Sequence, residues 1–269
     1  MQDIRDVLFR DIAERRYRAV LLPERDGFLS GVEDAVRKTQ ELGIEWRSEL
    51  REGDRLCCNR GFAELIGTPK QIAIAEECVI GLLAKTSGIA TAARRAVDMA
   101  AGQIEIVSGS WKKMPPDMKT AVRRAISTGG ASFRICEPPM LYLDKNFIRM
   151  FGSIRTALDA AAATGDMTKV IQIKGIEQTI EEETRQAVEG GADILMVDTG
   201  NRRDVEDCLR QIEKMHRGGQ LRVAFAGNVK IAEIPSMLGQ GIDLLCIGKE
   251  IVDAGLLDMK LNVIEEVPQ

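Results

Sequence analysis

The feature that most constrains the fold of this sequence is a regular alternation of short apolar runs and amphipathic segments after residue 103. The apolar runs predict strands at Ile104–Val107, Met140–Leu143, Lys169–Ile173, Ile194–Val197, Arg222–Ala226 and Leu244–Ile247. The segments between them predict helices near residues 117–127, 153–164, 177–189, 203–217 and 230–239. Such alternation is typical of a parallel sheet, and six units favour closure into an α/β barrel over an open sheet.

The residues before this alternation follow a different pattern. Apolar spacing predicts helices at residues 4–20, 30–42, 68–87 and 88–101, and short strands at residues 19–22 and within residues 56–66. Short strands and helices in this order predict a small α+β domain at residues 1–87. The barrel domain is expected at residues 88–258, and the tail at residues 259–269 is expected to return to the small domain as a strand.

Composition excludes several classes of function. The formal net charge is -4 and no block of Lys and Arg stands out, so the basic patch of a nucleic-acid-binding protein is missing. The single histidine, His216, excludes a multi-histidine zinc site and argues against Ser-His-Asp catalysis. The six cysteines form no Cys-x-x-Cys pair, which favours reduced thiols. Without a signal core or a membrane-length apolar run, we expect a cytoplasmic protein.

Polar residues and glycines follow the predicted strands at their carboxyl ends, where the active sites of α/β barrels lie. Asp198 ends an apolar strand, and burying its carboxylate unpaired would cost free energy. Gly227-Asn228 and Gly248-Lys249 follow the last two strands and offer free backbone N–H groups. We predict a phosphate cradle at these two turns, beside Asp198. The alternatives are plain turns at the glycines and a helix N-cap at Asp198.

Basic residues also lie at strand ends or in the adjoining loops. They are Lys112, Lys113, Arg134 and Lys145. Each alone is typical of a solvated surface charge. Together they would form a positive mouth that suits an anionic substrate.

Several runs of the sequence carry a resemblance to a known family. They are Glu76-Glu77, Thr86-Ser87-Gly88-Ile89-Ala90-Thr91, Ile194–Asp198, Phe225–Val229, Gly241–Gly248 and Leu257–Met259. Together they resemble the nicotinate-nucleotide pyrophosphorylases, also called quinolinate phosphoribosyltransferases. The resemblance covers nearly the whole chain.

This resemblance implies an α/β fold, with an incomplete seven-stranded α/β barrel and an N-terminal α/β sandwich domain. It implies a homodimer, or a hexamer of dimers, in which the small domain of one subunit covers the barrel mouth of the other. The implied reaction, a step of NAD biosynthesis, joins quinolinate to phosphoribosyl pyrophosphate with Mg²⁺ and releases pyrophosphate and carbon dioxide. Asp198 would stabilise the ribosyl cation or position the Mg²⁺.

The family's site residues are carried over only in part. Its basic loop appears as Lys112-Lys113, with Lys112 in place of an arginine, and Arg134 is kept. In a later motif the order of the first two residues is exchanged to Asp144-Lys145.

The positions that would hold a dicarboxylate differ most. A family histidine falls at Phe133, a glutamate falls at Gln172, and the arginine lent by the neighbouring subunit falls at Glu77. A glutamate at position 77 would repel a dianionic ring, which favours an acceptor less anionic than quinolinate, with quinolinate itself as the alternative.

Three functions are compatible with these residues. The first is a phosphoribosyltransferase with catalytic Lys113, Asp198 and Lys145, substrate-binding Lys112, Arg134, Gln172 and Glu77, and phosphate-binding Gly227, Asn228, Gly248 and Lys249. The second is a non-catalytic nucleotide- or phosphate-binding homologue, because the carboxylate at position 172 is lost. The third is a barrel lyase that uses Lys145 or Lys174 as a Schiff-base amine.

Overall fold

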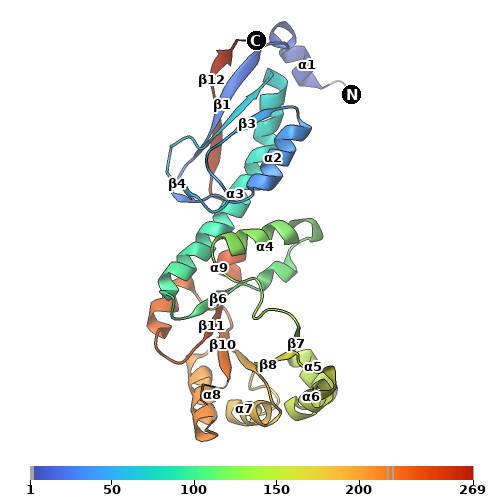
Figure 1. Cartoon of the computed structure of the whole chain (residues 1–269), viewed down its shortest axis with the longest axis vertical. Coiled ribbons are helices and arrows are strands. Elements are labelled where there is room, and N and C mark those ends of the chain that lie inside the picture. Colours follow the sequence, from blue (N-terminus) through green and yellow to red (C-terminus); the bar gives the residue numbers. More distant parts are fainter. Residues whose placement is uncertain (1–2, 217, 220, 269) are drawn as a thin grey trace. The chain divides into compact units, whose positions relative to one another are not determined.

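The computed structural model describes residues 3–216, 218–219 and 221–268 (Figure 1). The chain divides into two compact units. Unit 1 consists of Met1–Arg95, Lys113–Gly130 and Ile251–Gln269, and unit 2 consists of Ala96–Lys112 and Ala131–Glu250. Unit 1 therefore draws on segments from both the start and the end of the sequence.

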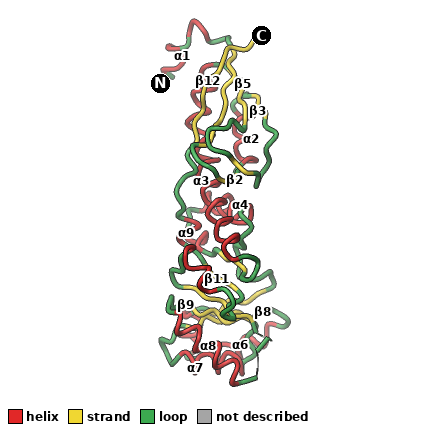
Figure 2. The backbone as a smooth tube through the Cα atoms, turned by 90° about the vertical axis from the view of Figure 1, so that its left-hand side faces the viewer, coloured by secondary structure: helices red, strands yellow, loops and turns green. Residues whose placement is uncertain are grey.

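Unit 1 is built on an antiparallel sheet of four strands. Their order is β12 (Met259–Val267), β1 (Arg16–Pro23), β5 (Ala63–Gly67) and β3 (Glu45–Arg47). β1 and β12 pair from Arg16↔Val267 to Pro23↔Met259, so the C-terminal strand lies beside an N-terminal strand (Figure 1). Figure 2 shows β12, β5 and β3 of this sheet from another side. Residue 269, the end of the predicted tail, lies outside the described residues. A smaller sheet joins β2 (Gly27–Phe28) to β4 (Arg55–Leu56).

The core of unit 1 lies between the sheet and two helices, α2 (Val32–Glu41) and α3 (Pro69–Ala100) (Figure 1). Leu21 of β1 and Leu65 of β5 are fully buried there against Val79 and Leu83 of α3. Alternate residues of a strand face the same side, so the apolar alternation of β1 and β5 fixes which face meets the helices. A further helix, α4 (Lys119–Thr128), also belongs to unit 1.

Two predictions for unit 1 are wrong: the long helix at residues 4–20 and the break between the helices at residues 68–87 and 88–101. The helix predicted at residues 4–20 is only α1 (Ile4–Leu8) and a 3₁₀ turn at Arg10–Ile12, because pairing of β1 with both β5 and β12 outweighs the local apolar spacing. The two helices predicted at residues 68–87 and 88–101 form the single helix α3. Gly88 does not break α3; it lets another part of the backbone approach the helix closely, as the carbonyl of Gly255 shows.

Unit 2 is a parallel sheet of six strands. Their order is β6 (Glu105–Val107), β11 (Leu244–Cys246), β10 (Arg222–Ala226), β9 (Ile194–Asp198), β8 (Thr168–Ile173) and β7 (Met140–Leu143). All five pairings are parallel, and all six predicted strands are confirmed to within two residues.

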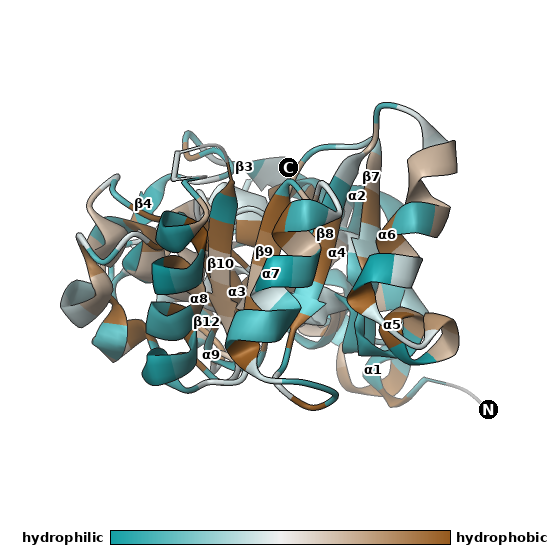
Figure 3. Ribbon diagram, turned by 90° about the horizontal axis from the view of Figure 1, so that it is seen from below, coloured by the Kyte–Doolittle hydropathy of each residue, from teal (hydrophilic) through white to brown (hydrophobic). Residues whose placement is uncertain are grey.

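Helices cover one face of this sheet. They are α5 (Lys145–Phe151), α6 (Ile154–Ala161), α7 (Ile180–Glu189) and α8 (Arg202–Lys214). The strands are brown and the helices α7 and α8 largely teal in Figure 3, which separates an apolar sheet from polar outer helix faces. The predicted helix at residues 230–239 is a 3₁₀ helix, Ile231–Met237, because Pro235 cannot donate an α-helical hydrogen bond. Residue 217, the predicted end of α8, lies outside the described residues.

The opposite face of the sheet has its own apolar cluster. Val170, Ile194, Met196, Ala224 and Leu244 meet there, and Tyr142 and Cys246 pack against them.

The predicted closure of the barrel is wrong, because the sheet is open. A seventh segment is present only as an isolated parallel bridge between Ser132 and Val107, at the β6 edge. The segment between Ser132 and β7 contains Pro138 and Pro139, which have no N–H group to donate to a neighbouring strand. The fold is thus an incomplete α/β barrel, open between its first and last strands.

Two glycines of α3 give a test of this packing. A Cβ at Gly88 would lie 2.2 Å from the carbonyl oxygen of Gly255, whereas a Cβ at Gly81 meets nothing within 4 Å. We expect Gly88→Ala to destabilise the protein by about 1–3 kcal/mol through overpacking. Gly81→Ala should stabilise it by up to about 1 kcal/mol through helix propensity. Denaturant unfolding followed by circular dichroism measures both; equal effects would contradict the close approach.

Candidate active site

The polar residues predicted at strand ends lie at one edge of the unit 2 sheet. In parallel strands the carboxyl ends share an edge, and β9, β10 and β11 are hydrogen-bonded neighbours. Asp198, Gly227 and Gly248 end or follow these three strands. The two glycine turns and the carboxylate are therefore brought together, as the phosphate-cradle prediction requires.

Asp198 is the centre of a hydrogen-bonded cluster. Its Oδ2 accepts from Nε2 of Gln172 at 2.6 Å and from Nζ of Lys174 at 3.3 Å. The same ammonium also donates to the backbone carbonyl of Asp198. The side chains of Asp198 and Lys174 are each 26% exposed, so the pair is partly shielded from water and remains within reach of a ligand.

Gln172 connects this cluster to α5. Its Oε1 accepts from the backbone N–H of Lys145 at 2.8 Å, and the side chain is buried. Asp144 is the N-cap of α5, because its carboxylate accepts from the N–H groups of Asn146 and Phe147. The order Asp144-Lys145 thus has a structural consequence. Asp144 caps α5, and the backbone N–H of Lys145 donates a hydrogen bond to the side chain of Gln172.

Aromatic rings contact two of the predicted basic residues, Lys112 and Arg134. Nζ of Lys112 lies 5.3 Å from the ring centroid of Tyr142, and the guanidinium of Arg134 lies 5.0 Å from that of Phe133. Nε1 of Trp111 donates to the carbonyl of Phe133 at 2.7 Å. These cation–π contacts stabilise two positive charges near the strand ends without neutralising them.

Tyr142 and Cys246 lie on the face of the unit 2 sheet that is opposite the helices, here called the inner face. The hydroxyl of Tyr142 and the thiol of Cys246 lie 3.4 Å and 3.9 Å from Sδ of Met196. Burial, with the negative charge of Asp198 nearby, raises the pKa of Tyr142 above its usual value and the pKa of Cys246 to about 12. Both groups therefore stay protonated at neutral pH.

The glycine turns are shaped by close backbone contacts. Gly227 has φ +107°, and a Cβ there would lie 2.2 Å from the backbone nitrogen of Gly200. A Cβ at Gly248 would lie 2.1 Å from Oγ of Ser110. Asn228 also has positive φ, and Lys249 is exposed as the first residue of the short helix α9 (Lys249–Val252). Glycine is therefore required at Gly227 by its backbone conformation and close contact, and at Gly248 it leaves room for the Ser110 side chain. Backbone turns of this kind can present N–H groups to an anion.

Two predicted site residues belong to unit 1. Lys113 is the last residue of the 3₁₀ helix Ser110–Lys113 and falls on the unit 1 side of the division. Glu77 lies on α3, where its carboxylate binds the guanidinium of Arg5 from α1. The negative charge at position 77 is thus paired within unit 1.

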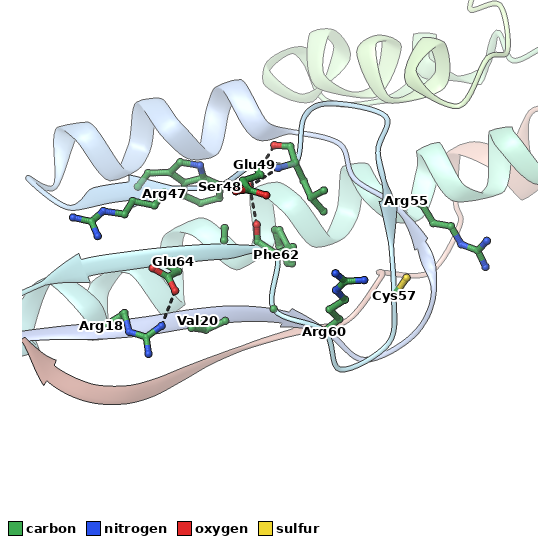
Figure 4. A pocket seen from close by; sticks show the side chains of 14 residues that line it. Arg18, Val20, Arg47, Ser48, Glu49, Arg55, Cys57, Arg60, Phe62 and Glu64 are labelled. Carbon is green, nitrogen blue, oxygen red and sulfur yellow. Dashed lines mark hydrogen bonds and ion pairs between the residues drawn. The ribbon is translucent and has the colours of Figure 1, made fainter.

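Unit 1 also contains a hollow of about 960 Å³ on its sheet (Figure 4). Its lining includes Arg18, Arg47, Arg55 and Arg60. Arg18 binds Glu64 at 2.6 Å, Arg47 binds Glu45 at 2.8 Å and Arg55 binds Asp26 at 3.4 Å. These ion pairs favour a structural role for three of the four arginines, so the strand ends of unit 2 are the stronger candidate site.

Two further searches cover the described part of the chain. Among residues 3–216, 218–219 and 221–268, no three His, Cys, Asp or Glu side chains are grouped so that they could hold a metal ion. No described helix has both the length and the apolar character needed to cross a membrane.

Comparison with known proteins agrees with this geometry. A family profile described as "Quinolinate phosphoribosyl transferase, C-terminal domain" matches residues 89–262. The chain belongs to the quinolinate phosphoribosyl transferase family. This member is 28% identical over 255 residues to the rat nicotinate-nucleotide pyrophosphorylase (carboxylating), with 93% of this chain and 82% of the rat protein covered. The human protein of the same name is 26% identical over 251 residues and covers 91% of this chain and 82% of its own length.

A solved structure of NadC from Streptococcus pyogenes has the same fold as this family member. The TM-score is 0.81 at 20% identity, and the alignment covers 98% of this chain and 93% of that chain.

Three features of the candidate site are not predicted from the sequence. They are the ion pair between Lys174 and Asp198, and the positions of Tyr142 and Cys246. The sequence predicts for Lys174 only the role of a Schiff-base amine. A signal for it exists, because Lys174 lies two residues after Gln172 and alternate residues of an extended strand face the same side. Tyr142 and Cys246 are also placed on the inner face by this alternation, within β7 and β11.

The raised pKa of Cys246 predicts selective alkylation. With a pKa of about 12, only on the order of 1 in 10⁴ of Cys246 is thiolate at pH 8, and its reaction with iodoacetamide should quicken about tenfold per pH unit above that. Cys57 and Cys58 are exposed and should be labelled first. Peptide mass spectrometry after brief labelling measures the order. Labelling of Cys246 as fast as Cys57 would contradict its burial beside Met196.

Proposed function

We propose that this protein is a phosphoribosyltransferase that transfers phosphoribose from phosphoribosyl pyrophosphate to a heteroaromatic acid. A ring nitrogen of the acceptor attacks C1′ of the ribose, the C–N bond forms, and the bond from C1′ to the diphosphate oxygen breaks. The observation that carries the proposal is the partly buried Asp198 carboxylate beside two glycine turns at the strand ends. Membership of the quinolinate phosphoribosyl transferase family supports it.

The residue roles follow from charge. The backbone N–H groups at Gly227-Asn228 and Gly248-Lys249 suit the 5′-phosphate, which stays unchanged in the reaction. The Asp198 carboxylate suits the ribose, where positive charge develops as the diphosphate leaves. Lys112 and Arg134, held over aromatic rings, suit the diphosphate or an acceptor carboxylate. Lys145 is proposed to take part at the same mouth, and a catalytic role of Lys113 remains a prediction from the sequence.

We propose an acceptor with less negative charge than quinolinate. The rat and human relatives are named for nicotinate nucleotide, the product formed from quinolinate with loss of carbon dioxide. In this chain Asp144 and Phe133 stand where the resemblance implies a lysine and a histidine, and Glu77, which is paired with Arg5, stands where it implies an arginine. Fewer cations at the mouth favour a monocarboxylate over a dicarboxylate. With quinolinate itself, the reaction would form nicotinate mononucleotide for NAD biosynthesis.

The residues around Asp198 do not fit a metal ion held by the protein. The site offers a single carboxylate, and this carboxylate already accepts hydrogen bonds from the ammonium of Lys174 and the amide of Gln172. We propose that Mg²⁺ arrives bound to the donor, where it would neutralise part of the charge of the leaving diphosphate. A homodimer or a hexamer of dimers, and a cytoplasmic location, also remain proposals.

Asp198→Asn tests the proposed role of the carboxylate. It should reduce pyrophosphate release by about a hundredfold, because a neutral amide no longer stabilises the developing ribosyl cation. Asp207→Asn, which changes a surface pair with Arg210 on α8, is the matched control and should retain the rate. The measurement is a coupled pyrophosphate assay across a panel of pyridine and imidazole acids.

The same panel separates the other functions. Calorimetric binding of phosphoribosyl pyrophosphate without pyrophosphate release from any acceptor would favour a non-catalytic binding homologue, which the amide at Gln172 makes the second candidate. Borohydride trapping of a carbonyl metabolite on Lys145 or Lys174 would favour a lyase instead.

A further inference from the structure

We propose that Lys174 supplies, from within the chain, the positive charge at Asp198 that a divalent cation would otherwise supply. The site then binds the diphosphate of phosphoribosyl pyrophosphate with an affinity that does not depend on Mg²⁺. This inference rests on the proposed function and names the binding chemistry of the same site.

The ammonium is placed by contacts on both sides. Nζ of Lys174 donates to the backbone carbonyl and to Oδ2 of Asp198, so two of its three N–H groups are used. The backbone N–H groups of Lys174 and Gly175 both donate to Oε2 of Glu183, at 2.8 Å and 2.9 Å. Glu183 is a buried residue in the first turn of α7. The turn that carries Lys174 is therefore fixed by a buried carboxylate on a helix.

The orientation of Gln172 excludes a cation from the same place. Oε1 of Gln172 accepts from the backbone N–H of Lys145, which determines that Nε2 faces Asp198. A metal ion on Oδ2 of Asp198 would thus meet the partial positive charge of an amide N–H and the full positive charge of an ammonium, and both would repel it. Mg²⁺ requires a near-octahedral shell of oxygen ligands, which this arrangement does not offer.

The remaining N–H group of Lys174 gives the site its ligand chemistry. An ammonium that is partly shielded from water makes strong charge-assisted hydrogen bonds to phosphate oxygens. The ammonium lies at the end of β8, next to β9, and the glycine turns follow β10 and β11, so the sheet order places all three at the same edge. One end of the donor, the 5′-phosphate, suits the turns, and the other, the diphosphate, suits Lys174.

The test is calorimetric titration of phosphoribosyl pyrophosphate into the full-length protein, in EDTA and in excess Mg²⁺. The wild type should bind equally well in both. Lys174→Gln should bind about tenfold or more weakly in EDTA, because a charge-assisted hydrogen bond is lost, and should regain affinity when Mg²⁺ is added. Lys174→Arg keeps the charge and should stay independent of Mg²⁺. Lys169→Gln, on the same strand, is the matched control and should behave as the wild type.

Thermal unfolding of each variant separates a folding defect from lost binding, and Lys174→Arg carries the test if Lys174→Gln is unfolded. Wild-type binding that requires Mg²⁺ would overturn the inference and leave the proposed function intact. Unchanged affinity of a folded Lys174→Gln in EDTA would overturn it as well. No binding by the wild type under either condition would overturn the inference together with the proposed function.

Discussion

The parallel register of β8, β9 and β10 is the constraint on which the candidate site depends. Gln172 pairs with Met196, and Asp198 pairs with Ala226, so these strands reach the same edge together. Lys174 is two residues beyond Gln172, and both side chains therefore reach Asp198 from one side. A slip of one residue in β8 would turn both toward the helix-covered face and leave Asp198 unpaired.

The positions where the sequence resemblance predicts a departure from the family each have a structural partner. Asp144 caps α5, Gln172 joins α5 to Asp198, and Glu77 binds Arg5. An exposed pair such as Arg155–Asp159 contributes only about 0–1 kcal/mol because water and salt screen it. The Asp198–Lys174 pair is more shielded, so removing one partner leaves a charge that water solvates poorly. Gln172 and the Asp144-Lys145 pair thus belong to one cluster around Asp198, whereas Glu77 is paired separately within unit 1.

The fold was predictable where local pattern and tertiary structure agree. The strands of unit 2 follow from their apolar runs because a strand buried on both faces has little choice of residue. The long α3 and the short α1 were not predicted, since a close contact of Gly88 and the pairing of β1 are tertiary facts. In the site, Asp198 and the glycine turns follow from strand ends. The orientation of the Gln172 side-chain amide cannot be predicted in this way, because it depends on a hydrogen bond from the backbone N–H of Lys145.

The pairing of β12 with β1 has a consequence for synthesis in the cell. β12 leaves the ribosome after residues 131–250 of unit 2, which emerge without interruption. Domains generally fold as they emerge, N-terminal parts first. Here β1 must wait for β12, and until β12 emerges the free edge of β1 is open to pairing with another nascent chain.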